Sequence, residues 1–405
     1  MAQGFAPSLQ SDKTDKSIST TTVKSVEEIQ AGLLSCVEQI EDPRTTRTQK
    51  HGLKDIIVIA ILAIISGAEG WEDIENYGLS KSQWLSEFLD LPHGIPSDDT
   101  FRRVFERINP SELEQALQQW LQPLLGSLVG EVVPIDGKTL RGSYDRQKEI
   151  KALNLVTAWA SQQQLVLGQI PVDDKSNEIT AIPALLELLD ITGAIITIDA
   201  MGTQTEIVRR IQEKKADYVL SLKKNHPTLH AEVKQKFNQI KTNSGQSGNI
   251  DYNQGVGAGH HRREKRRVWA IPVTEFESLY QSEQWVGLQT IVVVERTRHL
   301  WNKTTHEVQL YLSSLPANAR VLGNIIRQHW GIENQVHWTL DVTFNEDSSR
   351  IRSGHSPQNL ALLRRWALNA LRQETTLKRS LRQKQKRAAM NNDYMFSILS
   401  SFCQG

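Results

Sequence analysis

Apolar and polar residues are patterned differently in the two parts of the chain. Between residues 25 and 128 apolar positions recur at helical spacing, with breaks at Pro and Gly. Ser97 stands directly before one such segment, in the position of a helix N-cap. The most apolar run, residues 56–65, is too short to cross a bilayer and predicts a buried helix. We therefore expect an all-helical N-terminal domain over 25–128.

From residue 129 short apolar segments alternate with helical ones. Their order (three strands, helix, strand, helix, strand) is that of the ribonuclease H-like fold, in which the first and fourth strands are neighbours. This pattern predicts an α/β (α+β) domain over 129–375. The expected strands cover 132–136, 153–160, 164–172, 194–199 and 217–223, and the expected helices cover 181–190 and 204–216.

A β-rich insertion, at about 242–318, is expected within this domain. It begins with a stretch rich in Gly, Asn and Ser (242–259), and strand-like runs follow it at 267–273, 288–296 and 307–313. A helix is expected on either side of the insertion, near 228–240 and 321–338. The C-terminal stretch 357–389 is helical and basic, and we expect a basic tail over 376–405.

Two aspartates come at the ends of apolar segments that the fold makes neighbours. Asp136 follows Ile135 and precedes Gly137, and Asp199 follows Ile198. A buried strand that ends in an acid needs a cation or a hydrogen-bond donor to compensate the charge. Taken alone, each could be a turn residue or a helix N-cap. Together they indicate a carboxylate pair at one edge of the sheet.

The third candidate acid, Glu333, lies in the expected helix 321–338. His329, Glu333, His337 and Asp341 recur every four residues and would form one polar stripe. A zinc site built on His329 and His337 is unfavourable, because residues eight apart lie about 12 Å apart along a helix. The neighbouring Trp330 and Trp338 are expected in the core. Two strand-borne aspartates and a helical glutamate are the residues that a two-metal phosphoryl-transfer site needs.

Basic residues form two clusters, over 260–267 and 364–387. A basic run is often only a solvated face, but beside a metal-binding group of acids it indicates contact with phosphate. The residues for which we expect DNA contact are Lys138, Arg141, Arg327, His329, His337, Arg364 and Arg365.

Composition limits the class of protein. The chain has 405 residues, a formal net charge of +1 and two cysteines at opposite ends, which excludes a disulfide scaffold. Residues 1–24 are rich in Ser, Thr, Lys and Gln without an apolar signal segment, and a disordered tail is expected there. These features favour a cytoplasmic protein that is not associated with a membrane.

Several motifs, in order along the chain, carry a family resemblance. The chain resembles the bacterial insertion-sequence DDE transposases, in the ISAs-type group that includes the H-repeat-associated proteins. The similarity covers about residues 33–373. Its motifs are Asp42–Arg44, Gly94–Phe101, Ile135–Gly142, Lys175–Ile179, Thr197–Met201, His329–Asn334, Leu340–Asp347 and Arg364–Arg365.

The resemblance implies DNA transposition by a magnesium-dependent DDE triad. The triad residues would be Asp136, Asp199 and Glu333, which would hold Mg²⁺, with Mn²⁺ able to substitute. The implied partner is double-stranded DNA, both the terminal repeats of the element and the target. Because strand joining requires paired ends, a homodimer or larger assembly on DNA is expected. The region before residue 129 would serve DNA binding or assembly.

Three alternatives have different consequences. A domesticated or inactive relative would act as a nuclease without strand transfer. A DNA-binding regulator would keep its activity after replacement of the three acids. A glycosidase with two carboxylates would need an aromatic-lined sugar cleft and no basic clusters.

Overall fold

The computed structural model describes residues 30–45, 49–145, 149, 151–172, 177–242, 249–259 and 262–401. The tail predicted for 1–24 lies outside these residues. So do His260 and His261 of the first basic cluster and Lys175 and Ser176 of one family motif.

A single mixed sheet dominates the second part of the chain. Its order is β3-β2-β1-β4-β5-β9-β8-β7-β6. The strands are β1 (Val132–Leu140), β2 (Leu153–Ala160), β3 (Leu165–Pro171), β4 (Ile195–Ile198), β5 (Asp217–Leu222), β6 (Asp251–Gly259), β7 (Arg262–Pro272), β8 (Thr290–His299) and β9 (Thr304–Ser313).

The first five strands confirm the predicted ribonuclease H-like fold. β1, β2 and β3 form an antiparallel meander, whereas β4 pairs in parallel with both β1 and β5. In the β1–β4 pair Ile135 lies opposite Ile198. The residues that follow them, Asp136 and Asp199, therefore emerge side by side, because neighbouring strands are about 4.8 Å apart.

The β-rich insertion extends the same sheet. β9 pairs antiparallel with β5, and β8, β7 and β6 continue outward from it. β6 was not predicted as a strand, because three glycines among its nine residues weaken the β signal. β6 pairs with β7 over its whole length, and these backbone hydrogen bonds form the strand although its sequence has a weak β propensity.

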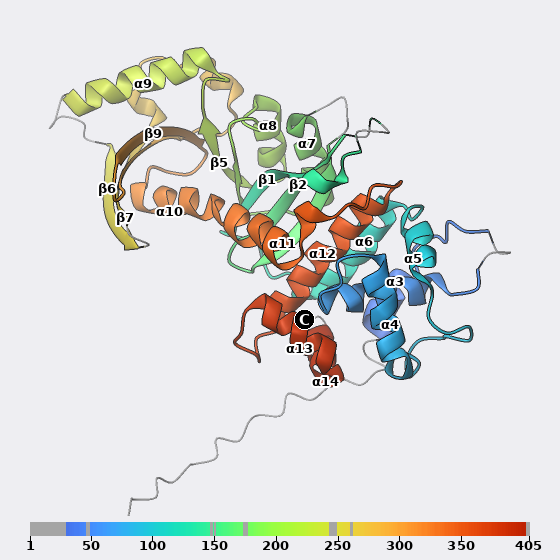
Figure 1. The fold of residues 1–405 in the computed structure, drawn as a ribbon. Coiled ribbons are helices and arrows are strands. Elements are labelled where there is room, and N and C mark those ends of the chain that lie inside the picture. Colours follow the sequence, from blue (N-terminus) through green and yellow to red (C-terminus); the bar gives the residue numbers. More distant parts are fainter. Residues whose placement is uncertain are drawn as a thin grey trace, which may run out of the picture.

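Helices cover both faces of this long sheet (Figure 1). α7 (Glu178–Leu188), α8 (Thr205–Glu213) and α9 (Pro227–Thr242) pack on one face, and α10 (Ala319–His329) crosses the other. β8 shows the alternation that this requires: Ile291 and Val293 belong to the core under α9, and Val292 and Val294 to the core under α10.

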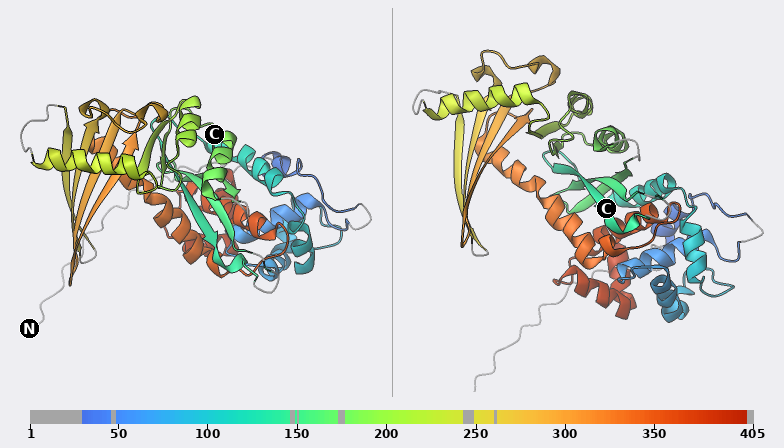
Figure 2. Two further views of the ribbon diagram at one scale, coloured as in Figure 1. Left: turned by 90° about the horizontal axis from the view of Figure 1, so that it is seen from above. Right: turned by 45° about the horizontal axis from the view of Figure 1, so that its top comes forward.

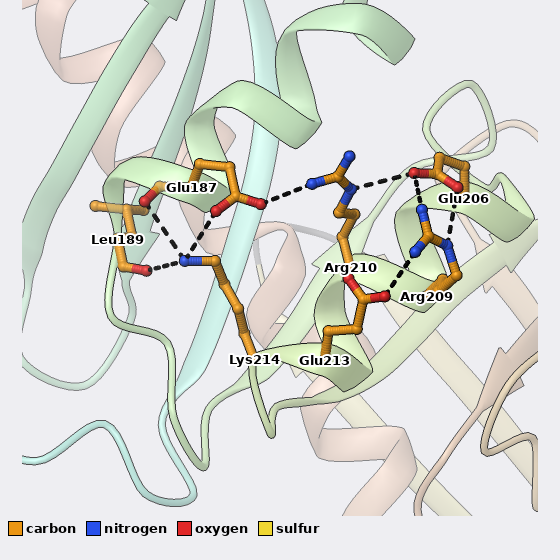
Figure 3. Close-up of polar contacts among 7 residues, drawn as sticks. All are labelled: Glu187, Leu189, Glu206, Arg209, Arg210, Glu213 and Lys214. Atoms are coloured by element: carbon orange, nitrogen blue, oxygen red, sulfur yellow. Dashed lines mark hydrogen bonds and ion pairs between the residues drawn. The ribbon is translucent and has the colours of Figure 1, made fainter.

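Ion pairs on the surface link α7 to α8 (Figure 3). Arg210 of α8 contacts the Glu187 carboxylate of α7 at 3.0 Å, and Lys214 donates to the carbonyl of Leu189 at 3.2 Å. These side chains are largely exposed, so the pairs contribute little to stability. The buried Ile182, Leu185 and Leu186 hold α7 on the sheet.

The helical region contains both ends of the described chain. Its core joins N-terminal helices to C-terminal ones, and Figure 2 shows them together at one end of the molecule, away from the insertion. They are η1 (Gln30–Leu34), α2 (Ser35–Val37), α3 (Leu53–Ile65), α4 (Trp71–Leu85), α5 (Asp98–Phe105), α6 (Pro110–Leu121), η3 (Gln122–Leu124), α12 (Ser356–Gln373), α13 (Leu381–Met390) and α14 (Asn392–Ser400). Short 3₁₀ turns elsewhere are η4 (Arg141–Ser143), η5 (Val273–Glu275), η6 (Ser282–Gln284) and η8 (Glu346–Ser348).

Two predictions about these helices have clear outcomes. The apolar run 56–65 lies in α3, which is buried throughout except at Lys54, and Ser97 accepts the Thr100 amide as an N-cap. The tail predicted for 376–405 is wrong for its described residues, because α13 and α14 pack Met395 and Ile398 into the helical core. Within the described ranges, none of the helices has the length and apolar character needed to cross a membrane.

α12 connects the helical core to the sheet. Trp366 stacks on Trp120 of α6 with ring centroids 3.6 Å apart. Three residues later, the Asn369 amide donates to the Val166 carbonyl at 2.9 Å and accepts from the Val166 amide at 2.8 Å. Asn369 therefore serves as a hydrogen-bonding partner for β3, the edge strand of the sheet.

Replacing Asn369 with Ala should destabilise the protein by about 2–5 kcal/mol, because both backbone groups of Val166 would stay buried without a partner. Denaturant unfolding would measure this change. Asn238→Ala, at an exposed position of α9, is the matched control and should stay within about 0.5 kcal/mol. Equal stability of the two variants would contradict the assigned role.

Candidate active site

The two aspartates lie where the β1–β4 pair ends. Asp199 directly follows β4, as predicted. Asp136 is different: β1 continues to Leu140, so Asp136 lies inside a strand and not at its end. Beyond Ile135, β1 pairs only with β2, because β4 has stopped. The backbone of β1 at Asp136 therefore borders the gap that β4 leaves.

Glu333 lies on an irregular helix rather than on the regular helix predicted for 321–338. α10 ends at His329, a π-helical segment η7 (Ile332–His337) follows, and α11 (Trp338–Thr343) completes the connection. The Trp338 amide donates to the Glu333 carbonyl, which is the i→i+5 bond of a π turn. Such π segments are often found at functional sites.

Close packing against β2 and α12 fixes the position of this segment. Gly331 lies on the ring of Trp159 in β2, where a Cβ atom would come within 2.7 Å of the ring. The guanidinium of Arg372 in α12 lies 6.0 Å from the centre of the same ring and donates to the Gln335 carbonyl. Ile332 and Val336 are buried in the helical core. The segment can therefore present Glu333 toward the sheet in one orientation.

The three acids line one cavity of about 450 Å³. Asp136 and Asp199 lie on its sheet side, and Glu333 comes from η7. The wall formed by Glu307 to Tyr311 belongs to β9, so the insertion is part of the site. The lining also includes Thr197, Lys223, His230, His329 and Trp330.

Electrostatic coupling shows that the acids act on one another. Burial, together with the charges of Asp199, Glu178 and Glu333, raises the pKa of Asp136 to about 7, against a hydrogen bond from the Gly137 amide. Burial and Asp199 also raise the pKa of Glu178. Glu178 was not predicted as a site residue, although it lies in the family motif Lys175–Ile179.

The two histidines near the triad are uncharged at neutral pH. Burial lowers the pKa of His329 to about 4, and its Nδ1 lies 2.9 Å from the Thr197 hydroxyl. Burial, with Arg365 and Lys138, lowers the pKa of His337 to about 3, and its Nδ1 lies 3.6 Å from Asp136 Oδ2. Neutral imidazoles contribute no positive charge toward phosphate.

Four of the predicted DNA contacts are inside the protein. Lys138, His337, Arg364 and Arg365 are 9%, 7%, 2% and 3% exposed. Lys138 pairs with Asp341 at 2.5 Å and lies 3.9 Å from Glu346, which pairs with Arg365 at 2.7 Å. The predicted direct contact with DNA does not fit these positions. Asp341 and Glu346 belong to the motif Leu340–Asp347. Their spacing in the sequence did not predict that they would lie beside Lys138.

The two remaining arginines among the predicted contacts face solvent. Arg141 is 83% exposed in its side chain and lies 3.5 Å from Asp347, and Arg327 is exposed on α10. Trp330 and Trp338, expected in the core, are 42% and 60% exposed.

The donor set fits a divalent cation with a preference for oxygen. The acids are hard ligands of the kind that Mg²⁺ and Mn²⁺ take. No ion pair with Lys or Arg joins Asp199, Glu178 or Glu333 to any residue that the structure describes. In the same residues no three acidic, His or Cys side chains are close enough to enclose an ion without further ligands. The acids thus form an open group, as suits a cation that is completed by substrate oxygens.

Comparisons of the sequence and of the structure with known proteins gave the following matches. Residues 128–370 match the family described as Transposase DDE domain, and residues 34–121 match the family described as DDE_Tnp_1-associated. The chain is 38% identical to "Putative transposase YncI" of Escherichia coli O157:H7, over 91% of this chain and 94% of that protein. It is 36% identical to "H repeat-associated putative transposase YhhI" of Escherichia coli K12, over 91% and 97%. A solved structure of piggyBac transposase in a synaptic complex with hairpin DNA aligns with a TM-score of 0.40 and 13% identity, over 93% of this chain and 78% of that one.

The raised pKa of Asp136 predicts how stability depends on pH in the metal-free protein. Because its folded pKa lies above the unfolded value near 3.8, the wild type should lose stability as pH rises from about 4 to about 7. Asp136→Asn removes this loss and should be more stable than wild type by about 2–4 kcal/mol at pH 8, but not at pH 4. Denaturant unfolding in the presence of a chelator would measure both.

Glu72→Gln on the exposed face of α4 removes one charge away from the site and is the control. It should stay within about 0.5 kcal/mol of wild type at both pH values. An Asp136→Asn variant no more stable than wild type at pH 8 would show that neither burial nor the neighbouring acids disfavour the charge on Asp136.

Proposed function

Because the chain belongs to the DDE transposase family, we propose that Asp136, Asp199 and Glu333 are its catalytic triad. The activity is cleavage of DNA at the ends of an insertion sequence, followed by joining of those ends to target DNA. One observation carries the assignment of the triad: three acids from β1, the end of β4 and the π segment line a single cavity.

DDE transposases use divalent metal ions. We propose Mg²⁺ for this chain, with Mn²⁺ able to substitute, held by Asp136, Asp199 and Glu333. When bound, such ions lower the pKa of a water nucleophile and neutralise charge on the phosphate and the leaving oxygen. The negative charge of the acids, uncompensated by Lys or Arg in the described residues, supports this assignment.

The groups around the triad hold it in place. The Lys138–Asp341 pair joins β1, two residues after Asp136, to α11, which continues the segment that carries Glu333. Glu346 and Arg365 extend this link to α12. Thr197, two residues before Asp199, contacts His329 at the end of α10. These contacts connect β1 to α11 and β4 to α10, so they hold the elements that carry the three acids in fixed positions.

Double-stranded DNA would reach the cavity from the solvent side. Arg141 and Arg327 are exposed and suited to contact phosphate, and His329 lines the cavity. We propose that the protein holds the two terminal repeats and the target as a homodimer or larger assembly. Residues 25–128 would serve DNA binding or assembly and 129–375 catalysis. The site of action would be chromosomal DNA in the bacterial cytoplasm.

The triad is tested by cleavage of a labelled duplex from the borders of this gene, with Mg²⁺ or Mn²⁺. Wild type should nick it at a defined position, and Asp199→Asn should be slower by more than about 100-fold. Loss of groups that only support a metal ligand already costs about 10- to 100-fold. Asp393→Asn, on α14 away from the cavity, should cleave like wild type.

Three outcomes would contradict the proposal in whole or in part. Binding of the duplex without cleavage by wild type would indicate an inactive relative or a regulator. Cleavage by Asp199→Asn at the wild-type rate would remove Asp199 from the mechanism. Nicking without joining of the 3′ ends to a second duplex would reduce the function to that of a nuclease.

A second test separates DNA contact from support of the fold. Arg365→Ala should lower the free energy of unfolding by about 3–5 kcal/mol, because Glu346 would stay buried without its partner. Arg327→Ala should keep its stability within about 0.5 kcal/mol, weaken DNA binding and reduce the salt dependence of log K by about one. Unfolding curves and salt-titrated binding would measure both. A stable Arg365→Ala protein with weakened DNA binding would instead assign Arg365 to the DNA.

A further inference from the structure

Glu178 places a fourth carboxyl group at the triad. It is the first residue of α7, and Asn177 caps that helix by accepting the Ile179 amide at 3.0 Å. The buried face of α7 packs on the sheet through Ile182 and Leu185. The start of the helix, and with it Glu178, is thereby held beside β1.

The space that Glu178 fills exists because residue 137 is glycine. A Cβ atom at Gly137 would lie 1.9 Å from Glu178 Oε1 and 2.5 Å from its carboxyl carbon. Any side chain there would displace the carboxyl group. Gly137 thus lets an acid from another element approach the backbone next to Asp136.

Ordinary structural roles explain only part of this position. A glutamate in the first turn of a helix is favoured by the helix dipole. That role does not require the side chain to lie over β1, where the charge of Glu178 acts on Asp136 and Asp199. Placing a fourth, half-buried carboxylate near three others is unfavourable unless a cation compensates the charge.

An independent observation also points to a ligand here. His337 is 7% exposed, and its Nδ1 faces Asp136 Oδ2 at 3.6 Å, too far for a hydrogen bond. Its Nε2 has no hydrogen-bond partner among the described residues. Nε2 lies on the opposite side of the ring from Nδ1, so the observation that bears on the acids is the missing hydrogen bond between His337 and Asp136, which leaves that carboxylate open to a cation.

We propose that Glu178 is a fourth carboxylate of the catalytic centre and helps Asp136 and Asp199 to hold a divalent cation. This inference rests on the proposed function, since it adds a residue to the same site. The motif Lys175–Ile179 then has a chemical reason: it delivers this acid to the triad. Glu178 supplies the carboxylate, and Gly137 leaves the space that this carboxylate needs.

Binding of Mn²⁺ to the full chain, followed by the electron paramagnetic resonance signal of the free ion, tests the proposal without requiring DNA cleavage. Glu178→Gln should weaken Mn²⁺ binding by about tenfold or more. Gly137→Ala should weaken it similarly by displacing the Glu178 carboxyl group. The double variant should add little to either change, because both remove the same interaction.

Glu187→Gln is the matched control, since it removes a carboxylate from the same helix at the surface (Figure 3). It should bind Mn²⁺ like wild type. Thermal unfolding of the metal-free variants would show that Glu178→Gln remains folded. Lower stability with unchanged Mn²⁺ binding would assign Glu178 to the fold alone and overturn the proposal.

Asp199→Asn separates failure of this inference from failure of the proposed function. If Asp199→Asn loses Mn²⁺ binding while Glu178→Gln keeps it, the fourth ligand is wrong and the triad stands. If wild type and Asp199→Asn take up Mn²⁺ equally, the metal site itself is wrong and the fourth ligand is overturned with it.

Discussion

Repulsion among carboxylates is the constraint on which the rest of this structure depends. Asp136, Asp199, Glu333 and Glu178 belong to four different elements, and the charges of the other three all act on Asp136. Such a group does not stay together by its own interactions. The surrounding fold must hold the four elements at a cost in stability, and a cation would offset that cost.

The protein holds them by pairing buried charges near the site rather than at it. Lys138, Asp341, Glu346 and Arg365 connect β1 to α11 and α12 through contacts of 2.5 to 3.9 Å. On the other side, Gly331 rests on Trp159 and fixes the π segment. Buried ion pairs are a costly way to gain stability, but they fix orientation when every partner is present. The basic residues of this region thus serve the geometry of the acids.

The sequence predicted the elements better than the side-chain environments. Alternation and helix signals were enough for the five core strands, and the order of elements placed Asp136 beside Asp199. β6 escaped detection because its glycines hide a strand that exists through pairing with β7. The π turn at Glu333 escaped because it depends on Trp159 and Arg372, distant in sequence. The burial of Lys138 and Arg365 depends on Glu346 in the same way, and the basic residues alone did not indicate this pairing. Glu178 could not be identified from the sequence, because its contact with Gly137 joins residues that are about 40 positions apart.

The most direct measurement of the central claim is the position of the metal ion. A structure of the protein bound to a DNA end in Mn²⁺, with the ion located by its anomalous scattering, would provide it. The account predicts an anomalous peak in the cavity lined by Asp136, Asp199 and Glu333. A peak on other residues, or ordered DNA in the cavity without any peak among these acids, would contradict it.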